Sequence, residues 1–466
     1  MSYGHRWYDG DLCAERRDLG GSLVLCRAAK EDAEAVALFN ARVHHSIGEP
    51  FEQREPHQDI AACTRDLMSG THPTCAVTDF TVVEDVQTGS VVSSMCLIPQ
   101  RWSYEGVEFG AGLPEFVGTH PDYRRRGLVR EQFETIHRWS SKRGHLMQAI
   151  GGIPYYYRQF GYEMAVSMGA GRRIYAAEVP AHSDKDDAHA RSFRLRFAET
   201  SDAPFLSRLD RQASERYLLT CTRDELLWRY EVAGRNPQSD ESLEIRIVED
   251  SEEGPVGYLC CQRNLDEGSL RVTGYELVGG LSWLEVTPVV LGKLKEIGQE
   301  HAASSQEQLT SLVFELGEHH PFYESLPERL LHRLPPDDRR DHYAFYVRVP
   351  DLPEFLRAIV PVLERRLANS VAAGHTGRLQ VSFYGDGLHL QLERGRMKAI
   401  EGWSQNEGES GDAAFPNLTF LQLLFGHRSV EELDYAFADC LPGSGDARVL
   451  LKTLFPKSPS DLWPIW

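Results

Sequence analysis

The sequence is short of positive charge and of paired cysteines. Its 466 residues include 50 lysines and arginines against 69 aspartates and glutamates, so the net charge is −19. Nucleic acids and anionic membranes attract proteins through a basic face. We therefore expect no nucleic-acid partner, and a cationic small molecule is easier to attract. The nine cysteines include no CxxC pair, which argues against a disulfide framework and a structural zinc site; we expect no metal.

Long apolar runs are also missing. No stretch approaches the ~18 consecutive apolar residues of a membrane-spanning helix, so we expect no membrane span. The first residues, MSYGHRWYDGDLCAERRDL, lack the apolar core of a signal peptide. We therefore expect a cytoplasmic protein with reduced thiols. The 41% hydrophobic and 26% charged residues are typical of a folded soluble chain, and its length predicts two to four domains.

One order of strand and helix patterns occurs twice along the chain. Residues 1–175 contain strand patterns on both sides of an amphipathic helix at 127–144. The polar segment 176–192 has no apolar period and predicts a linker. Much the same order returns over 193–349. Residues 350–466 differ, with a helix and then the alternating pattern of a hairpin. The sequence predicts a mixed α/β (α+β) fold with three domains at 1–175, 193–349 and 350–466.

The stretch HPDYRRRGLVREQF, residues 120–133, has three consecutive arginines before Gly127. A strand ends near Thr119, and the amphipathic helix begins at or just after the glycine. The start of a helix has unpaired backbone N–H groups and partial positive charge, which together suit phosphate. Gly127 lets a ligand approach the backbone, and the arginines add charge-assisted hydrogen bonds. The alternative is a solvated basic turn. The second copy has LSWLEVTPVV there, so we expect it to bind no such anion.

These residues resemble a known family. VGTHPDYRRRGLV is similar to the acetyl-CoA signature of the GNAT superfamily of N-acetyltransferases, Arg/Gln-x-x-Gly-x-Gly/Ala, with Val129 in place of the last Gly or Ala. YYYRQFGY, residues 155–162, is similar to the second signature of that family, aromatic-Tyr-x-x-x-Gly-aromatic. We interpret PYYYRQF as a short helix with Pro154 in its first turn, and the resemblance puts the tyrosine of the signature at Tyr157.

The whole chain resembles the enhanced intracellular survival type of aminoglycoside N-acetyltransferase. In that type, two tandem GNAT-like mixed-sheet domains, the second degenerate, precede a sterol-carrier-protein-like α+β domain. The resemblance implies an acyltransferase that uses acetyl-CoA as co-substrate. The acceptor would be an amine of a small cationic substrate, aminoglycoside- or polyamine-like, or a lysine side chain. The alternative is a non-enzymatic carrier that senses acetyl-CoA and binds a lipid in an apolar pocket of the last domain. The sequence leaves open whether the protein forms a homo-oligomer.

The resemblance also implies which residues bind acetyl-CoA. The backbone of Val117 and Thr119 would contact the pantetheine arm, with Gly152 beside it on the second strand. A backbone N–H near Val117 or Gly118 would stabilise the oxyanion. The full set is Val117, Gly118, Thr119, Arg124, Arg125, Arg126, Gly127, Leu128, Val129 and Gly152.

Tyr157 is the candidate for assisting the leaving thiolate. A free tyrosine has a pKa of ~10 and a thiol ~8.5, so full proton transfer would be uphill by roughly 2 kcal/mol. Tyr157 therefore needs a lowered pKa, for which Arg158 is a candidate cause, or it only donates a hydrogen bond. The structural alternative is that it packs in the core with Tyr155 and Tyr156.

Two carboxylates are candidates for the base. Glu115 precedes the end of the motif strand and could act through a water, or it is a surface or salt-bridged carboxylate. The resemblance implies that the terminal carboxylate, here that of Trp466, folds back into the first active site. The tail LFPKSPSDLWPIW is apolar and stiffened by proline, unlike a frayed polar tail. The alternative is a tail that packs on the third domain.

Acidic residues between the first two helices could bind a cationic amine, or they form a solvated loop. They are Glu49, Glu52, Glu55 and Asp59. The adjacent histidine pairs 44–45 and 319–320 lack the spacing of metal ligands.

Overall fold

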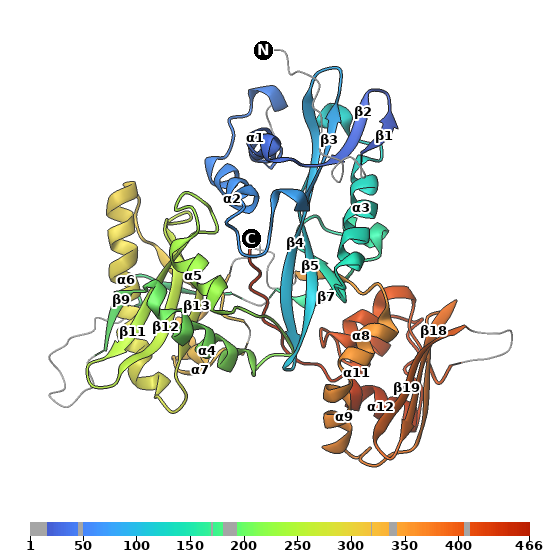
Figure 1. Ribbon diagram of the computed structural model, residues 1–466. Helices are drawn as coiled ribbons and strands as arrows, with labels where there is room; N and C mark the ends of the chain where they lie inside the picture. Colours follow the sequence, from blue (N-terminus) through green and yellow to red (C-terminus); the bar gives the residue numbers. More distant parts are fainter. Residues whose placement is uncertain are drawn as a thin grey trace.

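The structure is a computed structural model, and it describes residues 16–44, 50–168, 171–179, 193–317, 319–334, 343–404 and 411–466. Three sheets of nine, seven and four strands organise these residues (Figure 1). Helices and mixed sheets alternate along the chain, and an α+β region ends it. The predicted mixed α/β fold class is confirmed. In the described part of the chain, no helix is both long enough and apolar enough to cross a membrane.

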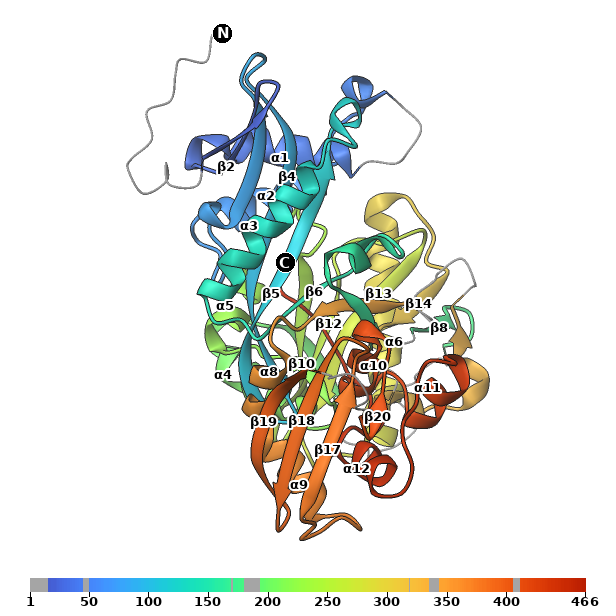
Figure 2. The ribbon, with the colours of Figure 1, turned by 90° about the vertical axis from the view of Figure 1, so that its right-hand side faces the viewer.

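The first sheet has the order β1-β2-β3-β4-β5-β6-β16-β7, and β10 pairs with β4 at one end. Its strands are β1 (Arg17–Gly20), β2 (Leu23–Arg27), β3 (Phe80–Asp85), β4 (Ser90–Tyr104), β5 (Val107–Thr119), β6 (Met147–Ile150), β16 (Ala344–Arg348), β7 (Glu163–Ser167) and β10 (Leu219–Cys221). Its helices are α1 (Ala33–Val43), α2 (Gln58–Met68), α3 (Leu128–Lys142) and the 3-10 helix η6 (Tyr156–Phe160). The helix expected at 127–144 is therefore confirmed as α3, which lies along the sheet in Figure 2.

A fork opens in the first sheet between β5 and β6. These two strands run parallel, and their register pairs Ala111 with Met147 and Gly112 with Gln148. Beyond this short contact β5 continues along β4, while β6 pairs with β16 on its other side. The two parallel strands therefore part.

The second sheet repeats this arrangement. Its order is β15-β8-β14-β13-β12-β11-β9, and β13 and β14 are its parallel pair. The strands are β15 (His332–Arg333), β8 (Arg172–Tyr175), β14 (Ser311–Phe314), β13 (Ser269–Leu277), β12 (Gly254–Gln262), β11 (Leu243–Asp250) and β9 (Phe193–Phe197). The helices are α4 (Ala203–Ser214), α5 (Glu225–Ala233), α6 (Trp283–Ser305) and α7 (Pro321–Glu324).

The two sheets exchange strands. β8 follows the first sheet in the chain but pairs with β14 and β15 of the second. β16 follows the second sheet but inserts between β6 and β7 of the first. The boundaries expected at residues 175 and 349 therefore do not coincide with the limits of the sheets, and the domain division stays a prediction.

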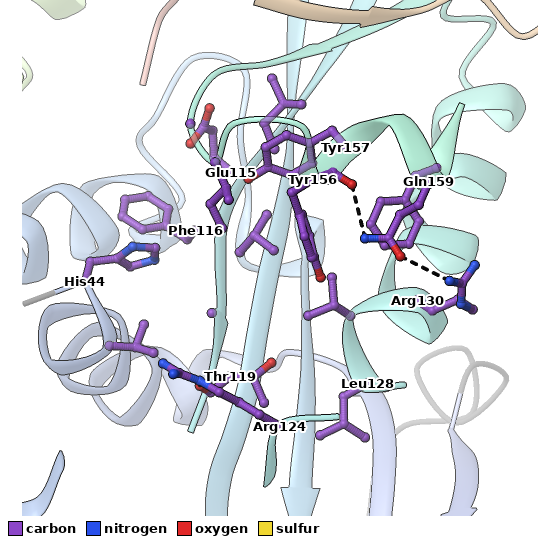
Figure 3. A pocket seen from close by; sticks show the side chains of 18 of the residues that line it. His44, Glu115, Phe116, Thr119, Arg124, Leu128, Arg130, Tyr156, Tyr157 and Gln159 are labelled. Atoms are coloured by element: carbon purple, nitrogen blue, oxygen red, sulfur yellow. Dashed lines mark hydrogen bonds between the residues drawn. The ribbon is translucent and has the colours of Figure 1, made fainter. Parts of the chain in front are cut away.

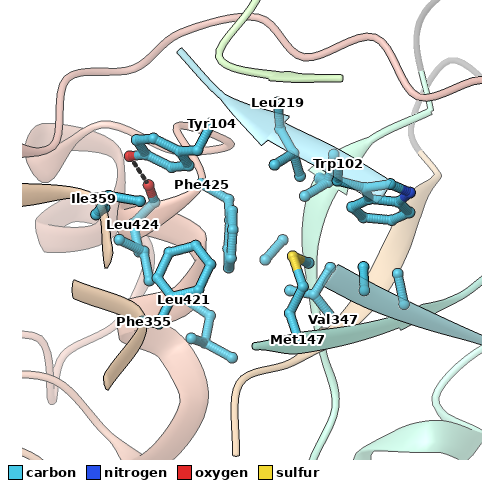
Figure 4. Close-up of a cluster of buried hydrophobic side chains, with 14 of the residues drawn as sticks. Trp102, Tyr104, Met147, Leu219, Val347, Phe355, Ile359, Leu421, Leu424 and Phe425 are labelled. Atoms are coloured by element: carbon cyan, nitrogen blue, oxygen red, sulfur yellow. Dashed lines mark hydrogen bonds between the residues drawn. The ribbon is translucent and has the colours of Figure 1, made fainter. Parts of the chain in front are cut away.

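The C-terminal region has a four-stranded sheet with helices on one face (Figure 1). The strands are β17 (Gly377–Ser382), β18 (Asp386–Glu393), β19 (Arg396–Ser404) and β20 (Ala413–Ala414). The helices are α8 (Leu352–Ala358), α9 (Val360–Ala368), α10 (Phe420–Leu424), α11 (Val430–Ala436) and α12 (Asp446–Leu454). An apolar core continues from this region into the first sheet, where Tyr104 packs against Phe355 and donates a hydrogen bond of 2.8 Å to the Leu424 carbonyl (Figure 4).

The last residues leave this region and return to the first two sheets. In Figure 1 the dark red tail runs from the C-terminal region to the terminus marked C, beside the long hairpin of β4 and β5. Leu218 N–H donates to the Pro459 carbonyl at 2.7 Å, and Asp461 N–H donates to the Leu219 carbonyl at 3.0 Å. The tail thus adds a short extension beside β10 before it ends.

Candidate active site

The fork between β5 and β6 holds a cavity of about 890 Å3. Figure 3 shows Arg124, Thr119 and Leu128 at one end and Glu115 with two tyrosines at the other. The cavity brings together every residue that the sequence analysis assigned to the site, except Arg126. Those that line it are Glu115, Val117, Gly118, Thr119, Arg124, Arg125, Gly127, Leu128, Val129, Gly152, Tyr157 and Trp466.

The turn between β5 and α3 forms the first end of the cavity. Gly127 is the residue before the helix and has φ of 79°, a left-handed conformation that favours glycine. Arg125 has φ of 61°, and Arg124 and Arg125 both reach the cavity as exposed side chains. The first four N–H groups of a helix lack intrahelical partners, and the helix dipole adds positive charge there. The turn therefore has the features of an anion site.

Arg126 lies outside the cavity. Its guanidinium donates to the Asp122 carbonyl at 3.3 Å and sits 4.8 Å from the centre of the Tyr123 ring. A cation–π contact with an aromatic ring adds to that position. Its role in binding is thus a prediction from sequence alone.

A bulge in β5 forms the wall of the fork. The register of β4 and β5 passes from Cys96–Glu115 to Ser94–Gly118, so it skips Phe116 and Val117, and Phe116 has φ of 51°. Such a bulge takes backbone groups out of the ladder, which fits an N–H donor at Val117. A Cβ on Gly118 would lie 2.5 Å from a methyl of Val43, so glycine lets α1 pack closely on this strand.

Tyr157 lies in η6, which begins at Tyr156 and follows Tyr155 in a left-handed conformation with φ of 65°. The short helix expected here is present as a 3-10 helix, but the expected place of Pro154 in its first turn is wrong, because the element starts two residues later. Tyr157 is buried at 3% exposure, and its hydroxyl lies 3.4 Å from the position of a Cβ on Gly152. The ring packs in the core, while the hydroxyl is at the cavity.

The electrostatics at Tyr157 favour a neutral phenol. Burial raises the pKa of Tyr157 well above its ordinary value, with further contributions from Glu115 and nearby tyrosines. The expected lowering of this pKa by Arg158 is wrong, because Arg158 pairs with Glu163 and lies over the Tyr155 ring at 5.1 Å. Tyr157 can therefore donate a hydrogen bond, but it is a poor source of a full proton.

Glu115, which lines the cavity, feels the charge of a second carboxyl group, that of Glu241. Burial and, to a smaller extent, Glu241 raise the pKa of Glu115 to about 8. Burial and Asp240 likewise raise the pKa of Glu241 to about 8. Glu241 belongs to the second half of the chain, so both halves contribute acidic groups here.

The C-terminus reaches the cavity through Trp466, which lines it. Arg235 donates to a terminal oxygen of Trp466 at 2.7 Å, and His72 Nε2 lies 3.4 Å from the same oxygen. Gln100 on β4 donates to the Ile465 carbonyl at 2.7 Å. The terminal carboxylate thus has a cation of the protein, Arg235, as its partner.

The expectation that four acidic residues share a loop between the first two helices is partly wrong. Asp59 lies in the first turn of α2, and His120 Nε2 lies 3.3 Å from a Glu52 carboxylate oxygen. Glu49, His45 and linker residues 180–192 lie outside the described residues. Within the residues that the structure describes, no group of three or more His, Cys, Asp or Glu side chains could hold a metal ion.

Sequence reasoning missed residues that line the cavity and residues that contact its lining. Some lie next to the motifs, such as His44 and Phe116, whose rings are 5.9 Å apart, and Gln159, which accepts from Arg130 at 3.2 Å. The spacing of the signatures gave no signal for these. Others, such as Arg235, are distant in the chain from the residues they contact, and no local pattern marks them.

Comparison with known proteins gives a family match for part of the chain. Residues 41–165 match the family model described as an acetyltransferase (GNAT) domain. The comparison with curated proteins found no match.

Several solved structures share the fold. A GCN5-related N-acetyltransferase from Anabaena variabilis has a TM-score of 0.62 at 14% identity, with 94% of this chain and 99% of that chain covered. A probable N-acyltransferase from Enterococcus faecalis has a TM-score of 0.63 at 14% identity, covering 95% and 100%. Eis1 from Mycobacterium abscessus has a TM-score of 0.58 at 12% identity, covering 93% and 97%.

The matched segment contains the fork, the turn at the start of α3 and Tyr157. An acyl-CoA co-substrate and an amine acceptor follow from the family match. The chain therefore contains a GNAT acetyltransferase domain at residues 41–165, and it is an acyltransferase.

Proposed function

We propose that the protein transfers an acetyl group from acetyl-CoA to an amine of a small cationic substrate. The observation that carries this proposal is one cavity lined by the turn before α3, by Tyr157 and by the C-terminal residue Trp466. We also propose that the chain belongs to the enhanced intracellular survival type. Likeness in fold to Eis1 over most of both chains supports this.

Acetyl-CoA binds with its pyrophosphate at the turn before α3. The N–H groups of Gly127, Leu128 and Val129 donate to the phosphate oxygens, and Arg124 and Arg125 donate further charge-assisted hydrogen bonds to the same oxygens. The pantetheine arm then lies along the fork, against the backbone of Val117 and Thr119 on one strand and Gly152 on the other. The second sheet lacks an arginine turn of this kind before α6, so one acetyl-CoA binds per chain.

In the reaction, the Trp466 carboxylate accepts a proton from the amine of the acceptor. A carboxylate has two oxygens, and the contact with Arg235 uses one of them. The amine nitrogen then attacks the thioester carbon, and the N–H of Val117 stabilises the oxyanion. As the C–S bond breaks, Tyr157 donates a hydrogen bond to the leaving thiolate, which takes the second proton from the new amide nitrogen, so that CoA leaves as the thiol. Glu115 is the alternative base, most effective near and above pH 8, where it ionises.

The acceptor side of the site is acidic. Burial raises the pKa of both Glu115 and Glu241 to about 8, helped by Glu241 in the first case and by Asp240 in the second, and a bound ammonium group would stabilise their ionised forms. The net charge of −19 also attracts cations to the protein. We therefore place aminoglycoside-like amines and polyamines before lysine side chains of proteins.

We propose three functional units at 1–175, 193–349 and 350–466. The first carries catalysis, the second is a degenerate GNAT-like unit, and the third is sterol-carrier-like. Support for the degenerate unit comes from its own parallel pair, β13 and β14, in a sheet of similar order.

The test is an assay of free thiol release from acetyl-CoA with a panel of amines. The panel contains an aminoglycoside, spermidine and a lysine peptide at equal concentration. We expect turnover with at least one polycationic amine, loss of turnover in a Gly127→Asp variant, and an acetylated product by mass spectrometry. No acetylated amine from any acceptor, with acetyl-CoA bound, would overturn the proposal in favour of a non-enzymatic sensor.

A further inference from the structure

The tail of the chain lies against the forks of both sheets. In the second sheet, β13 and β14 are paired from Ser269–Ser311 to Val272–Phe314, after which they part. Trp463 lies at this fork, because an added Cβ on Gly274 would sit 3.3 Å from its ring. Three residues later, Trp466 lines the cavity in the fork of the first sheet. One short segment therefore connects the two equivalent places.

The second fork is closed to a co-substrate. Among the residues that the structure describes, the cavity at this fork measures about 50 Å3, and Asp461 and Trp463 of the tail line it together with Glu276 and His320 of the second sheet. His320 Nε2 lies 3.1 Å from a Glu276 oxygen, and Arg216 pairs with the same carboxylate. The first fork is wide enough for an elongated ligand, at about 890 Å3. In the first sheet the fork leaves space that a ligand could occupy. In the second sheet the tail of the protein fills the equivalent space.

Strong polar contacts fix the tail on its way out of the second fork. The guanidinium of Arg223 lies 3.8 Å from the centre of the Trp463 ring and donates to the Trp463 carbonyl. Arg223 is 3% exposed, so its contacts are shielded from water. Gln100 both donates to the Ile465 carbonyl and accepts from the Ile465 N–H, at 2.7 and 3.3 Å. The backbone is thus fixed on each side of Pro464.

Arg235 completes the anchor at the terminal carboxylate. Its guanidinium donates two hydrogen bonds to Glu231, at 3.1 and 2.8 Å, and the third, of 2.7 Å, to Trp466. The side chains of Arg235 and Glu231 are each only 3% exposed. Glu231 therefore fixes the orientation of the Arg235 guanidinium. That orientation in turn restricts where the terminal carboxylate can lie.

We infer that the second, degenerate unit has become the holder of the catalytic C-terminus, with Arg235 as the residue that positions the Trp466 carboxylate in the active site. This inference rests on the proposed role of that carboxylate in the reaction. Arg235 does not touch the reacting atoms and acts through Trp466, so it is a positioning residue. A tail fixed at Trp463, Ile465 and Trp466 keeps little conformational freedom to lose when the acceptor binds.

The first experiment compares substitutions of two arginines near α5. Arg235→Met removes the anchor, and Arg235→Lys keeps a cation with poorer geometry. Arg229→Met is the matched control, because Arg229 forms the same i,i+4 pair with Glu225 but is exposed. We expect kcat to fall by about 10²-fold in Arg235→Met, the loss that a small misplacement of a catalytic group gives. Arg235→Lys falls less, and in all three variants KM for acetyl-CoA stays unchanged.

The second experiment tests whether Arg235 acts through the carboxylate. A glycine appended after Trp466 moves the terminal carboxylate, and Arg235→Lys is then made in the native and the extended protein. If the two groups act together, the substitution lowers kcat in the native protein but has little further effect in the extended one. Equal loss in both backgrounds would overturn the inference. Arg235→Lys keeps a partner for Glu231, so this comparison holds even if Arg235→Met fails to fold.

The third readout does not depend on activity. Carboxypeptidase A is added to each protein, and removal of Trp466 is followed by mass spectrometry. We expect faster removal in Arg235→Lys than in the native protein and in Arg229→Met. Equal trimming rates together with native kcat would reject Arg235 as the anchor while leaving the proposed acetyl transfer intact. Absence of turnover in the native protein with every amine would instead reject the proposed function, and the trimming result would stand by itself.

Discussion

Replacing Glu115 by glutamine should change how stability depends on pH. Burial and Glu241 raise the pKa of Glu115 from its ordinary value of 4.5 to about 8. Below pH 4.5 the carboxyl is protonated in both the folded and the unfolded chain. Between pH 4.5 and 8 only the unfolded chain releases the proton, so the free energy of unfolding falls as pH rises through this window. Glutamine cannot ionise, and the variant loses this dependence.

The size of the effect follows from the shift. At 1.36 kcal/mol per pKa unit, a change from 4.5 to about 8 corresponds to about 5 kcal/mol as an upper limit. Glu115 is only half-buried and lines an open cavity, so water screens the charge and we expect about 1–3 kcal/mol.

The assay is thermal unfolding of the native protein, Glu115→Gln and Glu108→Gln at pH 5 to 9. Glu108 lies on the same strand but is exposed and pairs with Arg101 at 3.2 Å, which makes it the matched control. We expect equal melting temperatures at pH 5 and a melting temperature of Glu115→Gln several degrees above the other two at pH 8.5. Parallel curves for all three proteins would refute the argument.

The same variant separates the two candidate bases. If the Trp466 carboxylate accepts the proton, Glu115→Gln keeps a substantial kcat and the shape of the native pH profile. If Glu115 is the base, kcat of the native protein rises through pH 8 as the carboxyl ionises, and the variant loses both the rate and that rise.

Three further predictions concern the site and the fold. Gly127→Asp should weaken acetyl-CoA binding by tenfold or more, because a carboxylate repels the pyrophosphate; calorimetry checks this against Gly144→Asp, which has a similar positive φ of 69° at the other end of α3. Tyr157→Phe should lower kcat by about tenfold to a hundredfold with unchanged acetyl-CoA affinity; a native kcat would leave the hydroxyl no role. The fragment 1–175 should fail to fold stably by circular dichroism, because it lacks β16 between β6 and β7; a cooperative melting transition would contradict this.

Local motifs carried most of what the sequence predicts about the site. The turn before α3 and the tyrosine of η6 each belong to a signature of a few consecutive residues. Their roles could therefore be predicted from the sequence alone. The pKa of Tyr157 could not, because it depends on how deeply the ring is buried. Arg158 is the next residue in the chain, but it does not lower the pKa of Tyr157, because its guanidinium pairs with Glu163.

Contacts between distant residues escaped prediction for a different reason. Arg235 and Trp466 are 231 positions apart, and Gln100 and Ile465 are 365 apart. Neither pair has a spacing or period that a single sequence can reveal. The strand exchange could not be predicted for the same reason. The pattern of residues 344–348 indicates a strand, but such a pattern does not show which sheet the strand will join.

The strand exchange and the tail both bring residues from later in the chain to the site. β16 supports β6, the strand that forms one side of the fork, and Tyr346 of β16 packs against the Tyr157 ring at 5.5 Å between centres. The tail supplies Trp466 from the other end of the chain. Tyr157 and the terminal carboxylate therefore reach their positions only after residues beyond the matched GNAT segment have folded. Under the proposed division into units, the second unit would keep its sheet because it supports the first, and it would need no turn that binds a ligand.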